Sequence, residues 1–177
     1  NLITGCTMSS VTNGGPYSAV AVMDASTGSV VRKNTISNNK ISNFRNFGIW
    51  IYYAFQQTIT GNEIFNNSST NLAAVTYGIY NFCSNKGGDY IIEDNFIHDL
   101  NTRNTTQYGI YHYILYGTGS NNVSIKRNKV VLKNLTSSAF GIYVYGLYST
   151  ISGNLETDNN QVEMEQTTGS TSTFYGI

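Results

Sequence analysis

Apolar and polar residues alternate over short segments of the chain, and no segment shows the 3.6-residue spacing of an amphipathic helix. The segments also recur. One motif, an aromatic residue followed by Gly, Ile and a second aromatic residue, occurs four times: Phe47–Trp50, Tyr77–Tyr80, Tyr108–Tyr111 and Phe140–Tyr143. Residues 17–20 form a degenerate copy, and residues 175–177 start another. The glycines at positions 48, 78, 109, 141 and 176 are 30, 31, 32 and 35 residues apart.

A second motif, Ile-x-x-Asn-x-(Ile/Val), lies inside each unit. Its copies are Ile36–Ile41, Ile59–Ile64, Ile92–Ile97, Ile125–Val130 and a last one, Ile151–Asn154, that lacks the final aliphatic residue. The stretch that joins the two motifs varies in length. Each unit is therefore expected to hold constant short strands separated by variable polar turns.

Strands this short cannot bury a hydrophobic face alone, but stacked copies of a 30-residue unit build a continuous core. Parallel crossovers are right-handed in nearly all known cases. The sequence therefore predicts an all-β, right-handed parallel β-helix (a solenoid) that forms a single domain over residues 1–177. About five coils of 30–35 residues are expected to begin near residues 17, 47, 77, 108, 140 and 175. Because the pattern is in progress at both ends, we interpret the chain as an internal part of a longer helix.

The two motifs together resemble those of the parallel β-helix repeat proteins of the pectin-lyase-like superfamily. The resemblance covers residues 17–177 and is specific for the fold, whereas members of the superfamily include lyases, hydrolases, phage tail spikes and adhesins. With the polar, Tyr-rich composition, it implies a secreted or cell-surface, bacterial protein.

The recurring Asn is expected to have a structural role. Asn tolerates left-handed backbone angles, and its amide can bond to the equivalent amide one coil away. We predict a ladder of five residues: Asn39, Asn62, Asn95, Asn128 and Asn154.

Alternation along a strand assigns the side chains of the first motif to two faces. The isoleucine of each motif is expected to point inward: Ile49, Ile79, Ile110 and Ile142. The residues two positions later should form a second inward column, made of Ile51, Asn81, His112 and Val144. His112 is therefore expected to be a hydrogen-bonded core residue. Two outward aromatic columns then remain as candidate ligand-binding residues: Trp50, Tyr80, Tyr111 and Tyr143, and beside them Tyr52, Phe82, Tyr113 and Tyr145. The opposite phase, with the rings inside, is the alternative.

Charge, hydropathy and cysteine content argue against nucleic-acid binding, a membrane span and a cysteine metal site. Ten basic and ten acidic residues give a net charge of zero, without the basic stripe of a nucleic-acid-binding protein. No apolar run approaches the roughly 20 residues that span a bilayer. Cys6 and Cys83 have no metal-ligand spacing and are expected to be unpaired, buried small hydrophobes.

The charged residues give only weak candidates for catalysis: Asp89, Glu93, Asp94, His98 and Asp99. The repeat register matches Glu93 with Lys126, Asp94 with Arg127 and Lys40 with Glu63, as expected for cross-strand ion pairs. His98 is expected to face outward and reach Asp99. No metal site or cofactor is expected, and calcium enters only if the chain is a lyase.

Three functions remain open. The first is a non-catalytic extracellular or cell-surface β-helix that binds a polysaccharide, another glycan or a neighbouring protein segment through its aromatic face. The second is a polysaccharide lyase or glycoside hydrolase, although the signature motifs of those enzymes are missing from this sequence. The third is a structural stalk of a large bacterial adhesin or fibre.

Overall fold

A computed structural model describes residues 1–9, 15–23, 33–66, 75–82, 88–100, 106–114, 121–146, 153–167 and 173–177. Every regular element in these ranges is a β-strand, and the strands form three parallel sheets of six strands each. The sheets are called A, B and C in the order in which the chain enters them.

Each sheet takes every third strand of the chain. Sheet A contains β1 (Leu2–Thr4), β4 (Asn34–Ser37), β7 (Gln57–Thr60), β10 (Gly88–Glu93), β13 (Asn121–Lys126) and β16 (Leu155–Asp158). Sheet B contains β2 (Thr7–Ser9), β5 (Lys40–Ser42), β8 (Glu63–Asn66), β11 (Phe96–Leu100), β14 (Lys129–Leu135) and β17 (Gln161–Gln166). Sheet C contains β3 (Ser18–Met23), β6 (Phe47–Tyr52), β9 (Val75–Phe82), β12 (Thr106–Ile114), β15 (Ala139–Gly146) and β18 (Phe174–Tyr175).

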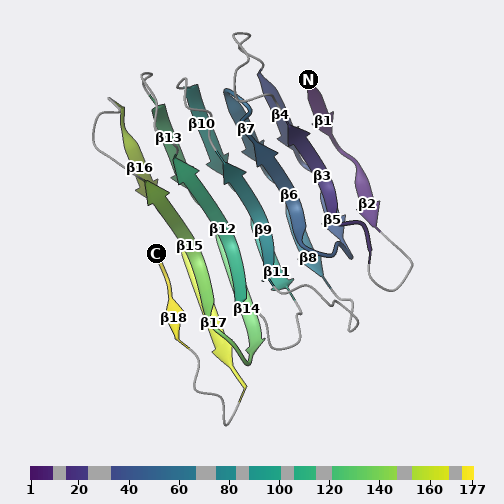
Figure 1. Ribbon diagram of the computed structural model, residues 1–177, viewed down its shortest axis with the longest axis vertical. Helices are drawn as coiled ribbons and strands as arrows, with labels where there is room; N and C mark the ends of the chain where they lie inside the picture. Colours follow the sequence, from purple (N-terminus) through teal and green to yellow (C-terminus); the bar gives the residue numbers. More distant parts are fainter. Residues whose placement is uncertain are drawn as a thin grey trace.

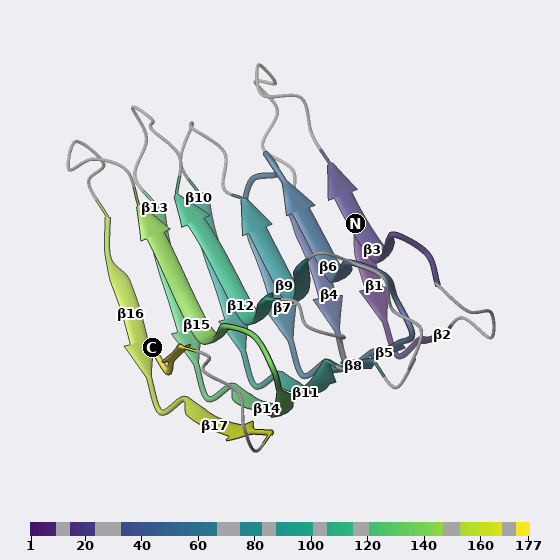
Figure 2. The ribbon, with the colours of Figure 1, turned by 60° about the horizontal axis from the view of Figure 1, so that its bottom comes forward.

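One circuit of the chain adds one strand to each sheet, so that equivalent residues of successive units become neighbours. Tyr77 pairs with Tyr108 and Ile79 with Ile110, which places their glycines on adjoining coils. Figures 1 and 2 show the coils following one another in chain order between termini at opposite ends of the solenoid. The predicted right-handed parallel β-helix is confirmed. It also includes an earlier coil than the sequence predicted, because β1 and β2 already pair with β4 and β5.

The core consists of aliphatic columns from all three sheets. The side chains of these columns are at most 1% exposed. They are Ile36, Ile59, Ile92 and Ile125 in sheet A, Ile41, Ile64, Ile97 and Val130 in sheet B, and Ile49, Ile79 and Ile110 in sheet C. Burial of a side chain of this size contributes about 1.5–3 kcal/mol. Because each column repeats once per coil, every coil covers the apolar face of the next.

The repeated glycine is required by a close approach between sheets C and B. A Cβ on Gly78 would lie 2.6 Å from Cγ2 of Ile97 and 2.7 Å from the carbonyl oxygen of Gly109. Gly48, Gly109 and Gly141 face the corresponding residues Ile64, Val130 and Val162 in the same way. The glycine therefore points inward and leaves room for the aliphatic column of sheet B.

The asparagine ladder runs along the corner between sheets A and B. The backbone N–H and the Nδ2 of Asn62 both donate to Oδ1 of Asn95, at 3.1 and 2.9 Å, and Nδ2 also donates to the carbonyl of Ile36. Asn39, Asn95 and Asn128 make equivalent bonds. Each buried amide thus satisfies its own polar atoms and a backbone group of another coil.

The last predicted member of this ladder was wrong. Asn128 donates to Oδ1 of Asn160, not to Asn154, which is exposed and pairs through its backbone N–H with Oδ1 of Asn122. The register pairs Ile125 with Thr157, so the motif of this coil reads Thr157–Val162 with Thr in the place of Ile. A polar residue at the aliphatic position concealed the true copy.

Cys6 occupies the corner position that Asn holds in later coils. Its backbone N–H donates to Oδ1 of Asn39 at 3.0 Å, but its thiol is exposed and free. The expectation that Cys6 is buried was therefore wrong, because in the first described coil the thiol lies at the surface, where it donates to the carbonyl of Thr4. Cys83 lies outside the described residues.

Candidate functional site: the aromatic face of sheet C

The predicted phase of the first motif is confirmed. Ile49, Ile79, Ile110 and Ile142 are 0–3% exposed, whereas Trp50, Tyr80, Tyr111 and Tyr143 are partly exposed on the other side of the sheet. Tyr52, Phe82, Tyr113 and Tyr145 are partly exposed as well. The eight candidate ligand-binding residues therefore lie together on the outer face of sheet C.

The rings form two ladders along the solenoid axis, because the sheet register places equivalent residues about 4.8 Å apart. In the first ladder Tyr80 stacks on Tyr111 at 5.1 Å and Tyr111 on Tyr143 at 5.4 Å between ring centroids. In the second, Phe82 stacks on Tyr52 at 5.1 Å and on Tyr113 at 4.6 Å. Tyr113 continues to Tyr145 at 5.1 Å.

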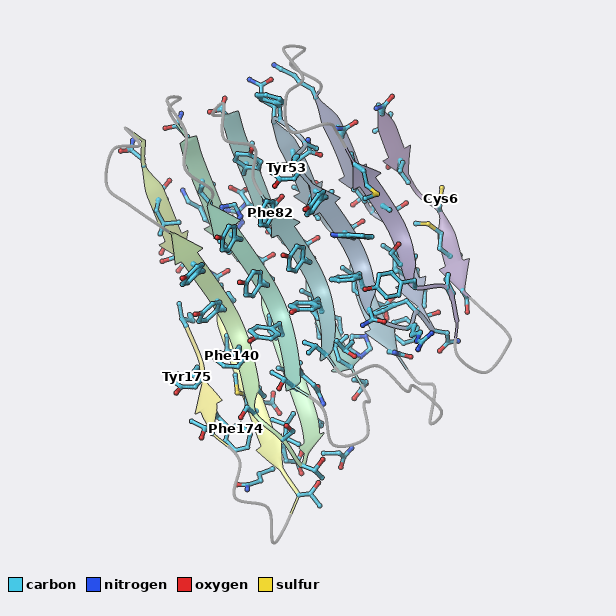
Figure 3. All side chains as sticks on the ribbon, in the orientation of Figure 1. Cys6, Tyr53, Phe82, Phe140, Phe174 and Tyr175 are labelled. Atoms are coloured by element: carbon cyan, nitrogen blue, oxygen red, sulfur yellow. The ribbon has the colours of Figure 1, made fainter. Side chains whose placement is uncertain are left out.

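A third ladder was missed by the sequence analysis. It contains Phe47, Tyr77, Tyr108, Phe140 and Tyr175, with stacked centroids 4.5–5.1 Å apart. Figure 3 shows Phe140 and Tyr175 as neighbours from β15 and β18. The signal was present, since these residues open every copy of the first motif.

Strict alternation of side chains places residues 47 and 49 on the same face of the strand. With Ile49 pointing inward, it therefore predicts that Phe47 points inward as well. In the structure Gly48 points into the core and Ile49 is buried as well, so the alternation breaks at the glycine. The ring of Phe47 then lies on the outer side, stacked on Trp50 at 5.0 Å and edge-on to Tyr17 at 5.4 Å. The same break recurs at each glycine of sheet C that faces sheet B.

Tyr53 extends the aromatic face beyond the end of β6. It follows Tyr52 in a left-handed backbone conformation, with φ of 57°. Its ring meets Phe82 edge-on at 4.9 Å, and Figure 3 shows the two side chains next to each other. A hydrogen bond with Tyr52 raises the pKa of Tyr53.

The ladders pack on one another in a herringbone arrangement. On the coils of β9 and β12, rings of the third ladder are nearly perpendicular to those of the first, at 81° for Tyr77 with Tyr80 and 89° for Tyr108 with Tyr111. On β9, rings of the first and second ladders are nearly parallel, at 4° for Tyr80 with Phe82. The coil of β6 differs, because Trp50 stacks on Phe47 and meets Tyr52 edge-on. Edge-to-face and offset-stacked pairs are the favoured geometries for aromatic rings. An interior ring such as Tyr111 thus has a stacked neighbour on each adjoining coil and stays partly exposed.

The face carries no formal charge in the described strands of sheet C, whose sequences contain no Asp, Glu, Lys or Arg. Its phenols are also hard to ionise. Burial, with a smaller effect from neighbouring phenols, raises the pKa of Tyr80 to about 12 and raises the pKa of Tyr77 and Tyr111 further. At neutral pH the face therefore offers neutral rings and neutral hydroxyl groups.

The acidic candidates Asp89, Glu93 and Asp94 lie on or beside sheet A, away from the aromatic face. Arg127 binds Glu93 at 2.7 Å and Asp94 at 2.8 Å, and the guanidinium lowers the pKa of Asp94. Asp89 accepts a hydrogen bond from Nδ2 of Asn122 at 2.8 Å. These carboxylates are engaged in cross-strand pairs.

Two of the three predicted cross-strand ion pairs are confirmed, Asp94 with Arg127 and Lys40 with Glu63. The predicted pairing of Glu93 with Lys126 was wrong at the level of side chains. The two residues are register neighbours, but Nζ of Lys126 contacts Glu156 at 2.6 Å and Glu93 binds Arg127 instead. Lys126 turns toward the following coil, where Glu156 lies.

His98 and Asp99 lie on sheet B and make the predicted contact. Nδ1 of His98 is 2.8 Å from Oδ2 of Asp99, and Nε2 is 3.4 Å from Oε1 of Glu63. The imidazole ring stacks with Phe96 and with Phe65, at 4.3 and 5.1 Å between ring centroids. Both ring nitrogens thus have carboxylate neighbours, and the ring packs against aromatic side chains.

The described part of the chain contains no group of three or more His, Cys, Asp or Glu residues placed to hold a metal ion. It also has no helix with the length and hydropathy that a bilayer crossing needs. The aromatic face is thus the main candidate for a functional surface in this part of the chain.

The fold and the repeated coil define a parallel β-solenoid. The chain belongs to the right-handed β-helix family, because residues 1–162 match the family model described as the right handed beta helix region. No curated protein and no solved structure matches the chain.

Proposed function

We propose that the protein is a non-catalytic binding scaffold that holds a glycan on the aromatic face of sheet C. The observation that carries the proposal is the gathering of three ring ladders on one sheet, whose described strands contain no Asp, Glu, Lys or Arg. Large contiguous aromatic surfaces on soluble proteins usually serve as binding sites, and Tyr and Trp combine an apolar body with a polar group.

The manner of contact follows from the herringbone packing. Because interior rings such as Tyr111 have a stacked neighbour on each adjoining coil, a sugar would meet ring edges and phenol hydroxyls, which donate and accept hydrogen bonds. A sugar can stack on the full face of a ring only at the ends of the ladders, where no further ring covers that face. Such a face favours a ligand that makes many similar contacts over one that fills a single pocket.

The arrangement of the acidic residues supports a binding role over catalysis. Asp89 and Glu93 are four residues apart on β10, a distance of about 13 Å along a strand. Glycosidases need two carboxyl groups within about 5–10 Å on either side of the scissile bond. Arg127 and Ser124 hold Glu93, through contacts of 2.7 and 2.5 Å, and Arg127 holds Asp94.

An extracellular or cell-surface location is part of the same proposal, since a polymeric glycan is met there. The competing roles are contact with a neighbouring protein segment, catalysis on a polysaccharide, and service as a structural stalk. Each predicts a different outcome of one binding experiment.

The test compares the protein with the double variant Tyr111→Ala/Tyr143→Ala on an array of polysaccharides. The matched control is Phe96→Ala, which removes an aromatic ring of sheet B that is 37% exposed. Glycan binding that the double variant loses and the control keeps would support the proposal, provided that both remain folded by circular dichroism. Absence of glycan binding by the unaltered protein, or release of reducing ends or unsaturated sugars, would refute it.

A further inference from the structure

We infer that the ligand of the aromatic face is an uncharged, extended glycan whose chain runs along the solenoid axis, across the strands. This inference rests on the proposed function and adds the chemical class and the direction of the ligand. It is carried by two observations, the absence of Asp, Glu, Lys and Arg from the described strands of sheet C and the repetition of an aromatic pattern on successive coils.

An anionic polymer needs cationic side chains on the surface that binds it. Uronates and sulfated glycans are held by cationic side chains, as phosphate polymers are. The described strands of sheet C supply none, whereas Lys40, Lys129 and Lys133 belong to sheet B and Lys126 to sheet A. A carboxylate laid on the aromatic face would lose water without gaining an opposite charge, which is unfavourable.

The phenols reinforce this selection. These hydroxyls are protonated at physiological pH, as in any tyrosine with a pKa near 10, and burial raises the pKa of Tyr80 to about 12 and that of Tyr111 further. A neutral phenol both donates and accepts a hydrogen bond, which matches the hydroxyl groups of a neutral sugar. The row Tyr80, Tyr111 and Tyr143 provides one such hydroxyl on each of three coils.

The direction follows from the spacing of the rings. Along the axis, Phe82 and Tyr113 are 4.6 Å apart and Tyr80 and Tyr111 are 5.1 Å apart, and aromatic side chains occupy both columns on the four successive strands β6, β9, β12 and β15. Along a strand the neighbours differ, and Tyr80 and Phe82 are 6.4 Å apart. A polymer of identical units therefore meets an equivalent surface at each step only when it runs along the axis.

The longest ladder also lies in this direction. Its accessible rings Tyr77, Tyr108, Phe140 and Tyr175 span three steps of about 4.8 Å, or roughly 14 Å. Across the face, the described residues form three ladders. An axial chain thus contacts more rings than a transverse one, and its affinity is expected to grow with length until the ladder is covered.

The experiment uses matched pairs of polymers that differ only in charge: polygalacturonate with its methyl ester, and neutral β-glucan, xylan and mannan with their carboxymethylated forms. Binding is measured by affinity electrophoresis and calorimetry at low and high salt. We expect at least one neutral polymer to bind about tenfold or more tightly than its charged form, with little dependence on salt. The affinity of its oligomers should rise with length beyond two residues.

The outcomes separate the two proposals. Preference for the charged polymers, with affinity falling steeply as salt rises, would overturn this inference and leave the proposed glycan binding intact. Affinity that stops rising at two residues would overturn the axial direction alone. Failure of all polymers to bind would overturn the proposed function and this inference together.

A charge variant gives an independent check. Tyr111→Lys places a cation in the middle of the first ladder, where the ring is partly exposed. It should weaken binding of the neutral polymer and give the carboxymethylated form a new, salt-sensitive affinity. Phe96→Lys on sheet B is the control for added charge elsewhere. Equal gains by both variants would show that the neutral face does not select the ligand.

Discussion

Asn81 and His112 meet inside the solenoid at equivalent positions of adjoining coils, with the Asn81 Nδ2 2.9 Å from Nδ1 of His112. Both side chains are fully buried. Because the amide nitrogen can only donate, Nδ1 accepts, and the proton of the neutral imidazole lies on Nε2. This confirms the expectation of a hydrogen-bonded core histidine.

Acid should destabilise the fold through His112. Burial lowers the pKa of His112 to about 3, whereas an unfolded histidine titrates near 6.5. The neutral imidazole therefore contributes its full share to the free energy of unfolding above pH 6.5. This share falls by about 1.4 kcal/mol per pH unit as the pH decreases from 6.5 toward 3. Urea unfolding at a series of pH values measures this slope.

The matched control is His112→Asn, which installs the residue found one coil earlier at Asn81. In this variant, unfolding between pH 6.5 and 4 should take up about one proton fewer, and the free energy of unfolding should depend less steeply on pH. An unchanged slope in His112→Asn would contradict the assignment.

The asparagine ladder should contribute strongly to stability. Asn95→Ala leaves the Nδ2 of Asn62 and the carbonyl of Ile59 without their buried partner. We expect a loss of about 2–4 kcal/mol in the free energy of unfolding, because each unpaired buried polar group costs about 1–3 kcal/mol. Asn154→Ala, at the exposed position first assigned to the ladder, should change stability by less than about 0.5 kcal/mol. Similar effects of the two substitutions would disprove the corrected register.

The inward glycine should not tolerate a side chain. In Gly78→Ala the new Cβ would press on Ile97 and on the carbonyl of Gly109, and we expect a loss of about 1–3 kcal/mol, typical of overpacking. Gly176→Ala is the control, since nothing lies within 4 Å of the position of its Cβ. Thermal unfolding of both variants measures the difference. A neutral Gly78→Ala would show that sheets B and C separate easily.

Alkali should destabilise the aromatic face. The pKa of Tyr80 is raised to about 12 in the folded chain, while an unfolded tyrosine titrates near 10. The protonated phenol thus stabilises the fold fully below pH 10, and this stability is lost as the pH rises from 10 toward 12. Ultraviolet absorbance should show that one tyrosine fewer ionises near pH 12 in Tyr80→Phe than in the unaltered protein. An equal count in the two proteins would place the raised pKa on another residue.

The sequence alone identified the repeat and therefore the fold. A spacing of 30–35 residues between Gly-Ile motifs left stacking as the means of burying short strands. It also located the inward Ile49 and the outward Trp50, because side chains alternate along a strand. The prediction of the last ladder residue failed because Thr157 stands in the place of the aliphatic residue that marks the ladder motif.

The tertiary structure decided how the rings are arranged. That Phe47, Tyr77 and Tyr108 turn outward depends on the inward glycine beside them, and this requires the contact with the aliphatic column of sheet B. Whether a ring presents its face or its edge depends on neighbours about thirty residues away in the sequence. Periodicity along the chain fixes which residues become neighbours, whereas ring orientation and hydrogen-bond partners arise only when the coils pack.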